Sequence, residues 1–176
     1  MKYPILGALM VTIALALGVA CSSQPRTNNA TYIDGVKQAL EQADLQGVNV
    51  SEDQDKNTIT LTGTLHSDDA KLKAGEVAQS VAAGRVIANE ISVQPVGAES
   101  EARDIASNRD DAIEKNYKAA LISKGLNKQH IHFDAKNGVL TLKGTVRTAP
   151  ERGEAQQLAQ AVPNVAQVVN QLEIKR

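Results

Sequence analysis

Aromatic residues and cysteines are almost absent from this chain of 176 residues. Aromatic side chains make up 2% of it, with no Trp and one Phe, so Val, Ile, Leu and Ala must build any hydrophobic core. Cys21 is the single cysteine, which excludes an intramolecular disulfide. The net charge of −1 excludes the strong basic balance that draws proteins to nucleic acid, so we expect no nucleic-acid partner.

The sequence also lacks the arrangements typical of an active site. It shows no nucleophile–base constellation, phosphate-binding loop or carboxylate pair, so we expect a protein that is not an enzyme, with no catalytic residues and no cofactor. His130 and His132 alternate on one side of an expected strand, but without a third ligand we predict no metal site. The acidic run at 51–55 precedes a turn, where we expect solvated side chains and not calcium ligands.

Residues 1–21 have the pattern of a targeting segment. An apolar run of 17 residues covers 4–20, at the short limit for a spanning helix, and no stop-transfer charges follow it. Its end, "LGVAC", resembles the lipobox of bacterial lipoproteins, in which the cysteine is acylated and becomes the first mature residue. This resemblance implies a lipoprotein signal peptide and lipidation at Cys21. The alternative is a plain signal peptide cleaved near Ala20.

A polar tether is expected after the cysteine. Residues 22–30, "SSQPRTNNA", span about 15–18 Å on average as a flexible coil, which keeps the following chain close to a bilayer surface. Ser22 resembles the sorting residue of lipoproteins sent to the outer membrane. The expected location is therefore the periplasm, with a lipid anchor in the inner leaflet of the outer membrane.

The rest of the chain contains one unit twice. Residues 32–93 (copy one) align with 113–174 (copy two) without a gap, at a constant offset of 81, with 14 identities in 62 positions. The similar segments "TLTGTL" at 60–65 and "TLKGTV" at 141–146 fall on each other, and Val50 falls on Ile131. Such self-similarity indicates duplication of a supersecondary unit.

Hydrophobic periodicity predicts the order helix, strand, strand, helix, strand in each copy. We therefore expect an α+β fold of two tandem αββαβ units, each a small three-stranded mixed sheet with two helices on one face. The expected domains are 31–95 and 110–176. The linker between them, 96–109, is predicted as either a loop or an upstream extension of the first helix of copy two.

Small residues recur where the central strand and second helix of each copy are expected to meet. Gly63 and Gly144 lie on the core-facing side of their strands. We expect them to let strand and helix backbones approach closely, although a glycine bulge that bends the strand is the alternative. The helix positions expected opposite them are Ala74, Ala78, Ala155 and Ala159.

Two sequence stretches carry a resemblance to a known family. The segments "GVLTLKGTV" at 138–146 and "VPNVAQVVNQLEI" at 162–174 resemble the BON (bacterial OsmY and nodulation) domain. Copy one offers "NTITLTGTL" at 57–65 and "GRVIANEISV" at 84–93. Two such copies behind a lipobox look like dual-BON lipoproteins of the Gram-negative envelope and their osmotically inducible relatives. The resemblance implies phospholipid binding and a role in envelope integrity, without catalysis.

Charge divides unevenly between the copies. Residues 31–95 contain ten acidic and five basic side chains, whereas residues 110–176 contain seven acidic and ten basic ones. If either copy binds anionic phospholipid, the second is therefore expected to do so. The predicted headgroup contacts are Lys118, Lys124, Lys128, Lys143, Arg147 and Arg152.

Three hypotheses about function and charge remain open from the sequence. In the first, a membrane-anchored envelope protein binds anionic phospholipid through copy two. In the second, a scaffold binds an envelope protein partner along the edges or open faces of its sheets. In the third, the basic copy two docks against the acidic copy one, so that the opposite charges of the two copies neutralise each other within the protein.

Overall fold

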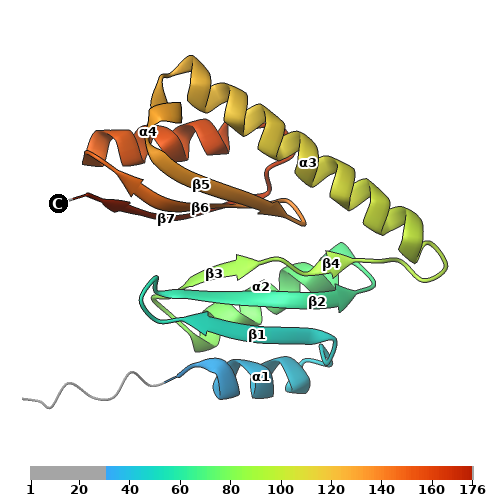
Figure 1. Ribbon diagram of the computed structural model, residues 1–176. Coiled ribbons are helices and arrows are strands. Elements are labelled where there is room, and N and C mark those ends of the chain that lie inside the picture. The colour runs from blue at the N-terminus through green and yellow to red at the C-terminus, as the bar shows by residue number, and fades with distance from the viewer. Residues whose placement is uncertain (1–30, 176) are drawn as a thin grey trace, which may run out of the picture. The chain divides into compact units, whose positions relative to one another are not determined.

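The computed structural model describes residues 31–175, and its elements follow the predicted order twice (Figure 1). The elements of the first half are α1 (Ile33–Gln42), β1 (Val48–Asp53), β2 (Thr58–Leu65), α2 (Asp68–Val81), β3 (Val86–Asn89) and β4 (Ser92–Val93). Those of the second half are α3 (Glu99–Ser123), the short 3-10 helix η1 (Leu126–Lys128), β5 (His130–Lys136), β6 (Val139–Val146), α4 (Ala149–Gln160) and β7 (Gln167–Ile174). The targeting segment, Cys21 and the tether at 22–30 lie outside the described residues.

Each half contains one mixed sheet. In the first, β2 pairs antiparallel with β1 and parallel with β3, and after a short interruption β4 continues the parallel pairing to β2. In the second, β6 lies between antiparallel β5 and parallel β7. The α+β fold class, with two tandem αββαβ units, is confirmed.

Aliphatic residues and alanines fill the core between the helices and one face of each sheet. In copy one, Val36 and Leu40 of α1 pack with Ala74 and Ala78 of α2, and each is at most 2% exposed. The corresponding residues in copy two are Tyr117, Leu121, Ala155 and Ala159, and Ile113 of α3 packs with them. Tyr117 also donates a hydrogen bond to the carbonyl of Ala155, 3.2 Å away, and packs edge-on against Phe133.

The connection between the copies is mostly helical. Helix α3 begins at Glu99 and continues to Ser123, so residues 99–109 form an upstream extension of the first helix of copy two, one of the two predicted alternatives. Glu99 and Glu101 lie in its first turn, where negative charge interacts favourably with the helix dipole.

The gap-free alignment of the two copies is wrong in one strand. Gly63 and Gly144 fall on each other in that alignment. In the sheets, Val48 of β1 lies opposite Gly63, and Ile131 of β5 lies opposite Gly144. Val48, and not Val50, is therefore the structural equivalent of Ile131, a shift of two residues. Copy two closes its hairpin with only Asn137 and Gly138 between β5 and β6, whereas copy one uses the four residues 54–57. Copy two therefore has two residues fewer in its hairpin turn and two residues more before β5, where η1 forms.

The glycines Gly63 and Gly144 do not serve helix packing, so that prediction is wrong. Their φ angles are +120° and +103°, a region that L side chains rarely adopt. A Cβ atom on Gly63 would collide with the carbonyl oxygen of Gly47, and one on Gly144 with that of His130. Strand pairing continues in register through Gly144, and β2 keeps the same parallel register with β3 and β4 on either side of Gly63, so neither glycine marks an inserted residue. Both are needed for the close approach of the neighbouring edge strand.

The helix-free faces of the two sheets meet at one side. Ala88 of β3 forms a buried cluster with Val139 of β6 and Val169 of β7. The side-chain amide of Gln167 donates to the carbonyl of Ile87 at 2.5 Å and accepts from the amide of Asn89 at 3.2 Å. This contact buries part of a face that the sequence analysis treats as open.

Ion pairs between the copies run in both directions. Lys136 of β5 pairs with Glu90 at 3.4 Å, and Lys56 of the first hairpin pairs with Glu173 of β7. The contact between the copies therefore pairs one lysine of each copy with a glutamate of the other. None of the six predicted headgroup contacts takes part in an ion pair among residues 31–175.

Candidate functional site

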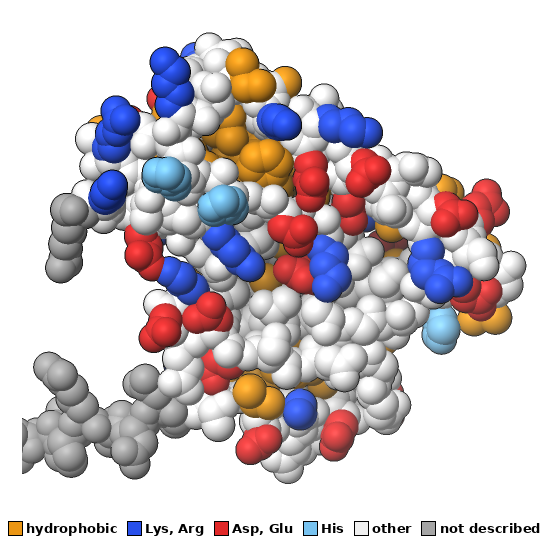
Figure 2. Space-filling model, in the orientation of Figure 1, with side chains coloured by type: hydrophobic (Ala, Val, Ile, Leu, Met, Phe, Trp, Pro, Cys, Tyr) orange, Lys and Arg blue, Asp and Glu red, His pale blue; other side chains and the backbone are white. Residues whose placement is uncertain are grey.

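All six cations predicted from the sequence are exposed at the surface of copy two. They extend from the C-terminal half of α3 through η1 and β6 to the first turn of α4. Figure 2 shows Lys and Arg side chains over this half of α3 and the adjoining end of the second sheet, while Asp and Glu are frequent over the N-terminal half of α3. Copy two therefore presents positive charge to solvent.

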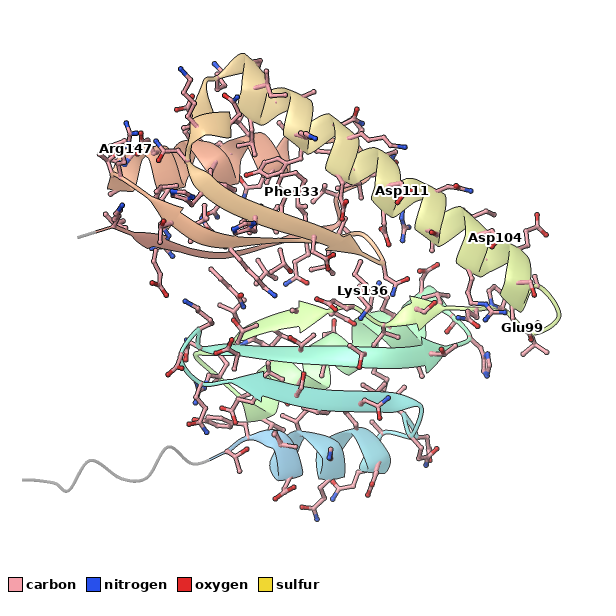
Figure 3. All side chains as sticks on the ribbon, in the orientation of Figure 1. Glu99, Asp104, Asp111, Phe133, Lys136 and Arg147 are labelled. Atoms are coloured by element: carbon pink, nitrogen blue, oxygen red, sulfur yellow. The ribbon has the colours of Figure 1, made fainter. Side chains whose placement is uncertain are left out.

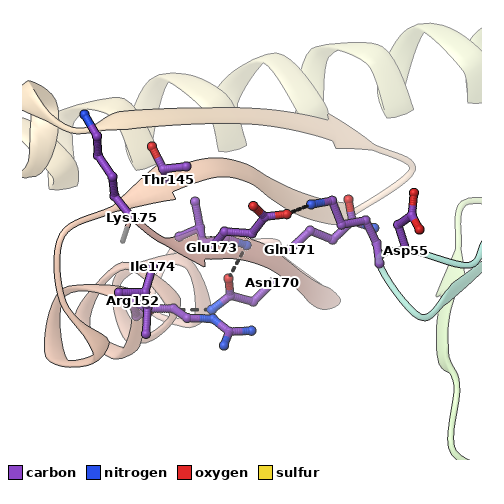
Figure 4. A pocket seen from close by; sticks show the side chains of 10 residues that line it. Asp55, Thr145, Arg152, Asn170, Gln171, Glu173, Ile174 and Lys175 are labelled. Atoms are coloured by element: carbon purple, nitrogen blue, oxygen red, sulfur yellow. Dashed lines mark hydrogen bonds and ion pairs between the residues drawn. The ribbon is translucent and has the colours of Figure 1, made fainter.

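Four cations surround one end of the second sheet, and we call this set the cationic end. Lys128, Arg147 and Lys175 line a small hollow of about 80 Å³ together with His130. Lys175 also lines an adjacent open groove of about 880 Å³, where Arg152 joins it (Figure 4). Lys175, which follows β7 directly, was missed by the sequence analysis, although its place after the last strand was a usable signal.

The N-terminus of α4 fixes the backbone of the cationic end. Thr148 caps the helix, and Glu151 completes a capping box by accepting from the amide of Thr148 at 3.0 Å. The same carboxylate accepts from the amide of Arg147 at 2.9 Å. The backbone of Arg147 is therefore held in place while its side chain extends into solvent at the end of the sheet (Figure 3).

The acidic residue in the larger groove already has a partner. Glu173 accepts a hydrogen bond from Lys56, which lowers the pKa of the carboxyl group and raises that of the Lys56 ammonium. Asp55 lies in the same lining, on the hairpin of copy one. The pairing of Glu173 with Lys56 leaves the charges of Arg152 and Lys175 without compensation from that carboxylate.

The remaining three cations line neither of these two hollows. Lys143 lies on the helix-free face, opposite His132 in the register. Lys124 forms the C-cap of α3, and Lys118 lies about one and two-thirds turns before it. The structure therefore brings Lys128, Arg147 and Arg152 together with Lys175, and leaves the other three predicted contacts along α3 and β6.

An apolar hollow adjoins Lys118, and the sequence analysis did not predict it. The hollow measures about 300 Å³ and is lined by Lys118, Leu121 and Ile122 of α3, by Leu126, Asn127 and Gln129 around η1, and by Ile131 and Phe133 of β5. Ile122 is 54% exposed, and Glu41 stands at its equivalent position in copy one. An apolar residue at a position where copy one has a charged residue was the sequence feature that could have indicated this hollow.

Neither the histidines nor the acidic side chains assemble a metal site within residues 31–175. His130 and His132 are exposed on β5, and no group of three or more His, Cys, Asp or Glu side chains in this part of the chain is placed to hold an ion. Over the same residues, no helix is both long and apolar enough to cross a bilayer.

Comparison with known proteins identifies the repeated unit. The BON domain matches residues 29–95 and again 109–176. The chain is also 28% identical over 142 residues to the osmotically-inducible protein Y of Escherichia coli (strain K12), an alignment that covers 80% of this chain and 69% of that protein. With two tandem matches that together span more than half of its length, the chain belongs to the BON-domain family.

Proposed function

We propose that this protein binds the anionic phospholipid surface of the bacterial envelope through copy two and helps to maintain that envelope under osmotic stress. The observation that supports the proposal is the set of exposed copy-two cations without an ion-pair partner among residues 31–175. Copy one, with its excess of acidic side chains, faces such a surface unfavourably.

The expected strength follows from the number of cations that reach the surface together. Each Lys or Arg close to an anionic leaflet contributes about 1 kcal/mol, and the effect fades within a Debye length of roughly 8–10 Å. The four residues of the cationic end lie at one end of the second sheet, which allows simultaneous contact. Binding of this kind is reversible and weakens with salt.

A lipid anchor supplies the second signal for stable attachment in this proposal. A single acyl chain gives only marginal membrane binding, whereas the diacylated cysteine that a lipobox implies anchors a protein stably, and an adjoining basic surface strengthens the attachment. The lipobox-like "LGVAC" and the short tether at 22–30 would hold the unit that begins at residue 31 close to lipid. The proposed location is the periplasmic side of the outer membrane, and the proposed role is binding without catalysis. The similarity to an osmotically-inducible protein supports the link to osmotic stress.

Vesicle flotation tests the proposal on a soluble form that begins at residue 22. That form retains the whole compact unit at 31–176. It should float with vesicles containing phosphatidylglycerol at 50 mM salt and lose most of its binding at 500 mM salt. Charge reversal at the cationic end, as Lys128→Glu with Arg147→Glu, should lower the bound fraction at least tenfold, because two favourable contacts become repulsive.

The duplicated architecture provides a matched control. Lys37 of α1 occupies the position equivalent to Lys118 and is likewise exposed. Lys37→Glu should leave flotation unchanged, whereas Lys118→Glu should reduce it. Equal binding by the parent and the cationic-end variant at low salt would reject lipid recognition by copy two. In that case, recovery of an envelope protein by crosslinking would favour the scaffold alternative.

A further inference from the structure

Strand β5 is an edge strand with one side turned toward α3. In an antiparallel pair, alternate residues direct their amides away from the partner strand. Ala135 does so, because its amide donates to Glu114 of α3 at 3.0 Å instead of to β6. Beyond the end of β5, Asn137 and Gly138 likewise donate to Asp110 at 2.6 and 2.9 Å. Two carboxylates of α3 thus occupy one half of this edge.

The other half of the edge faces the apolar hollow described above. Ile131 and Phe133 belong to the same alternating set as Ala135, and no hydrogen-bond acceptor within residues 31–175 receives their amides. The side chains of both residues line the hollow, with Leu121 and Ile122 on the α3 side and η1 closing one end. We call this hollow with its strand edge the α3–β5 groove.

The groove combines backbone hydrogen-bonding groups, apolar walls and positive charge. In Figure 2, hydrophobic side chains reach the surface between α3 and β5, and Figure 3 places Phe133 between the strand and the helix. Lys118 lines the groove itself, and Lys124 caps the end of α3. These two lysines are complementary to an acidic ligand.

The groove has no equivalent chemistry in the sequence of copy one. The two-residue shift that creates η1 in copy two supplies Asn127 and Gln129 to the lining. On the helix, Glu41 stands where copy two has Ile122. Duplication has therefore produced one copy with an apolar, lysine-rimmed edge and another with a carboxylate at the same place.

We propose that the α3–β5 groove binds a short, extended peptide segment of a partner protein that carries an apolar side chain and an acidic residue. Such a segment of about five residues adds to the edge of β5 as a further strand, and its carbonyls accept from the amides of Ile131 and Phe133. Its apolar side chain enters the hollow beside Ile122. Its carboxylate lies near Lys118, as the carboxylates of Glu114 and Asp110 already lie along the other half of the edge.

Peptide display on the soluble form from residue 22 tests this assignment. A library of random octapeptides is selected on the parent protein and, in parallel, on Ile122→Glu, which installs the residue of copy one at an exposed position and so preserves folding. We expect the parent to enrich peptides with alternating apolar residues and at least one Asp or Glu. For a labelled synthetic version of the most enriched peptide, Ile122→Glu should weaken binding at least tenfold and Lys118→Glu about fivefold.

Two further measurements separate strand addition from other modes of binding. Leu72→Glu, at a residue of α2 that is 65% exposed, should leave peptide affinity unchanged. Hydrogen exchange at the amide of Phe133 should slow at least tenfold when the peptide is bound. Equal enrichment of the same peptides on the parent and on Ile122→Glu would overturn the proposal. Peptide binding that leaves hydrogen exchange at the Phe133 amide unchanged would also overturn it. Loss of vesicle flotation in Ile122→Glu without any peptide selection would assign the groove to lipid instead, whereas the cationic-end variants test phospholipid binding independently.

Discussion

Single residues of this protein are constrained most severely where the backbones of neighbouring strands approach. At Gly144 the φ of +103° and the nearby carbonyl of His130 both exclude a side chain. Gly144→Ala should therefore lower the free energy of unfolding by about 2–3 kcal/mol, which combines backbone strain with overpacking. Urea denaturation of the soluble form measures this loss.

Gly153 of α4 provides the control for this substitution. A Cβ atom there would meet no atom within 4 Å, and the helical position favours alanine over glycine by up to about 1 kcal/mol. Gly153→Ala should therefore be neutral or stabilising. A Gly144→Ala protein as stable as Gly153→Ala would show that the strand tolerates a side chain and that the strained conformation has no structural role.

Tyr117 provides a pH-dependent prediction. Burial raises the pKa of its phenol above the ordinary value of about 10, and the hydroxyl donates to the carbonyl of Ala155. Below pH 10 the phenol is neutral in both folded and unfolded chains, so its contribution is intact. Above pH 10 the unfolded chain ionises first, which lowers stability by up to about 1.4 kcal/mol per pH unit.

Tyr117→Phe removes this dependence. At pH 8 the variant should be about 1 kcal/mol less stable than the parent, because one buried hydrogen bond is lost. Between pH 10 and pH 11 the difference should shrink, as only the parent carries the tyrosine that resists ionisation. Urea denaturation at pH 8, 10 and 11 measures the trend, and curves that remain parallel through pH 11 would contradict it.

Whole elements were predicted well wherever the hydrophobic period determined them. The stripe of Val36 and Leu40 is typical of a helix and the alternation of Ile59 and Leu61 of a strand, because each pattern reports which face is buried. Thr148 with Glu151 three residues on is a local signal that the sequence analysis did not use, and the structure forms it as a capping box. Local chemistry of this kind depends little on the rest of the fold.

The register of β1 and β5 was predicted incorrectly for a physical reason. A strand has a side-chain period of two, so a shift by two residues keeps every inward residue inward. The alternation of Val48 and Val50 therefore fits either register equally well. Only the turn distinguishes them, since Asn137 and Gly138 both adopt positive φ and close a two-residue hairpin, a connection that copy one lacks.

At the scale of the whole molecule, the sequence predicted which copy is basic but not where its cations gather. Exposure of Lys128, Arg147 and Arg152 follows from their positions outside the apolar pattern. Their grouping with Lys175 depends on how strand ends and the first turn of α4 meet in space, which no local pattern reports. The same limit applies to the α3–β5 groove, whose walls come from three separate elements.

Docking of the two copies belongs to this largest scale and has its own test. Ala88 is 2% exposed, although it lies on the face of β3 without helices, because Val139 and Val169 of copy two cover it. Ala88→Asp places a carboxylate in that apolar cluster and should lower the free energy of unfolding by about 3 kcal/mol or more. Each copy alone is of a size at which a single core is marginal, so the loss should affect the whole unit.

Thr64→Asp supplies the comparison, because Thr64 lies on the same face of the first sheet but is exposed. That substitution should change stability by no more than about 0.5 kcal/mol. The contrast between the two variants depends only on whether copy two covers Ala88, since both add the same charge to the same face. If Ala88→Asp is as mild as Thr64→Asp in urea denaturation, the face is open in solution and the copies fold without mutual support. A large difference would establish that duplication stabilises this protein by burying against each other the faces that one copy leaves uncovered.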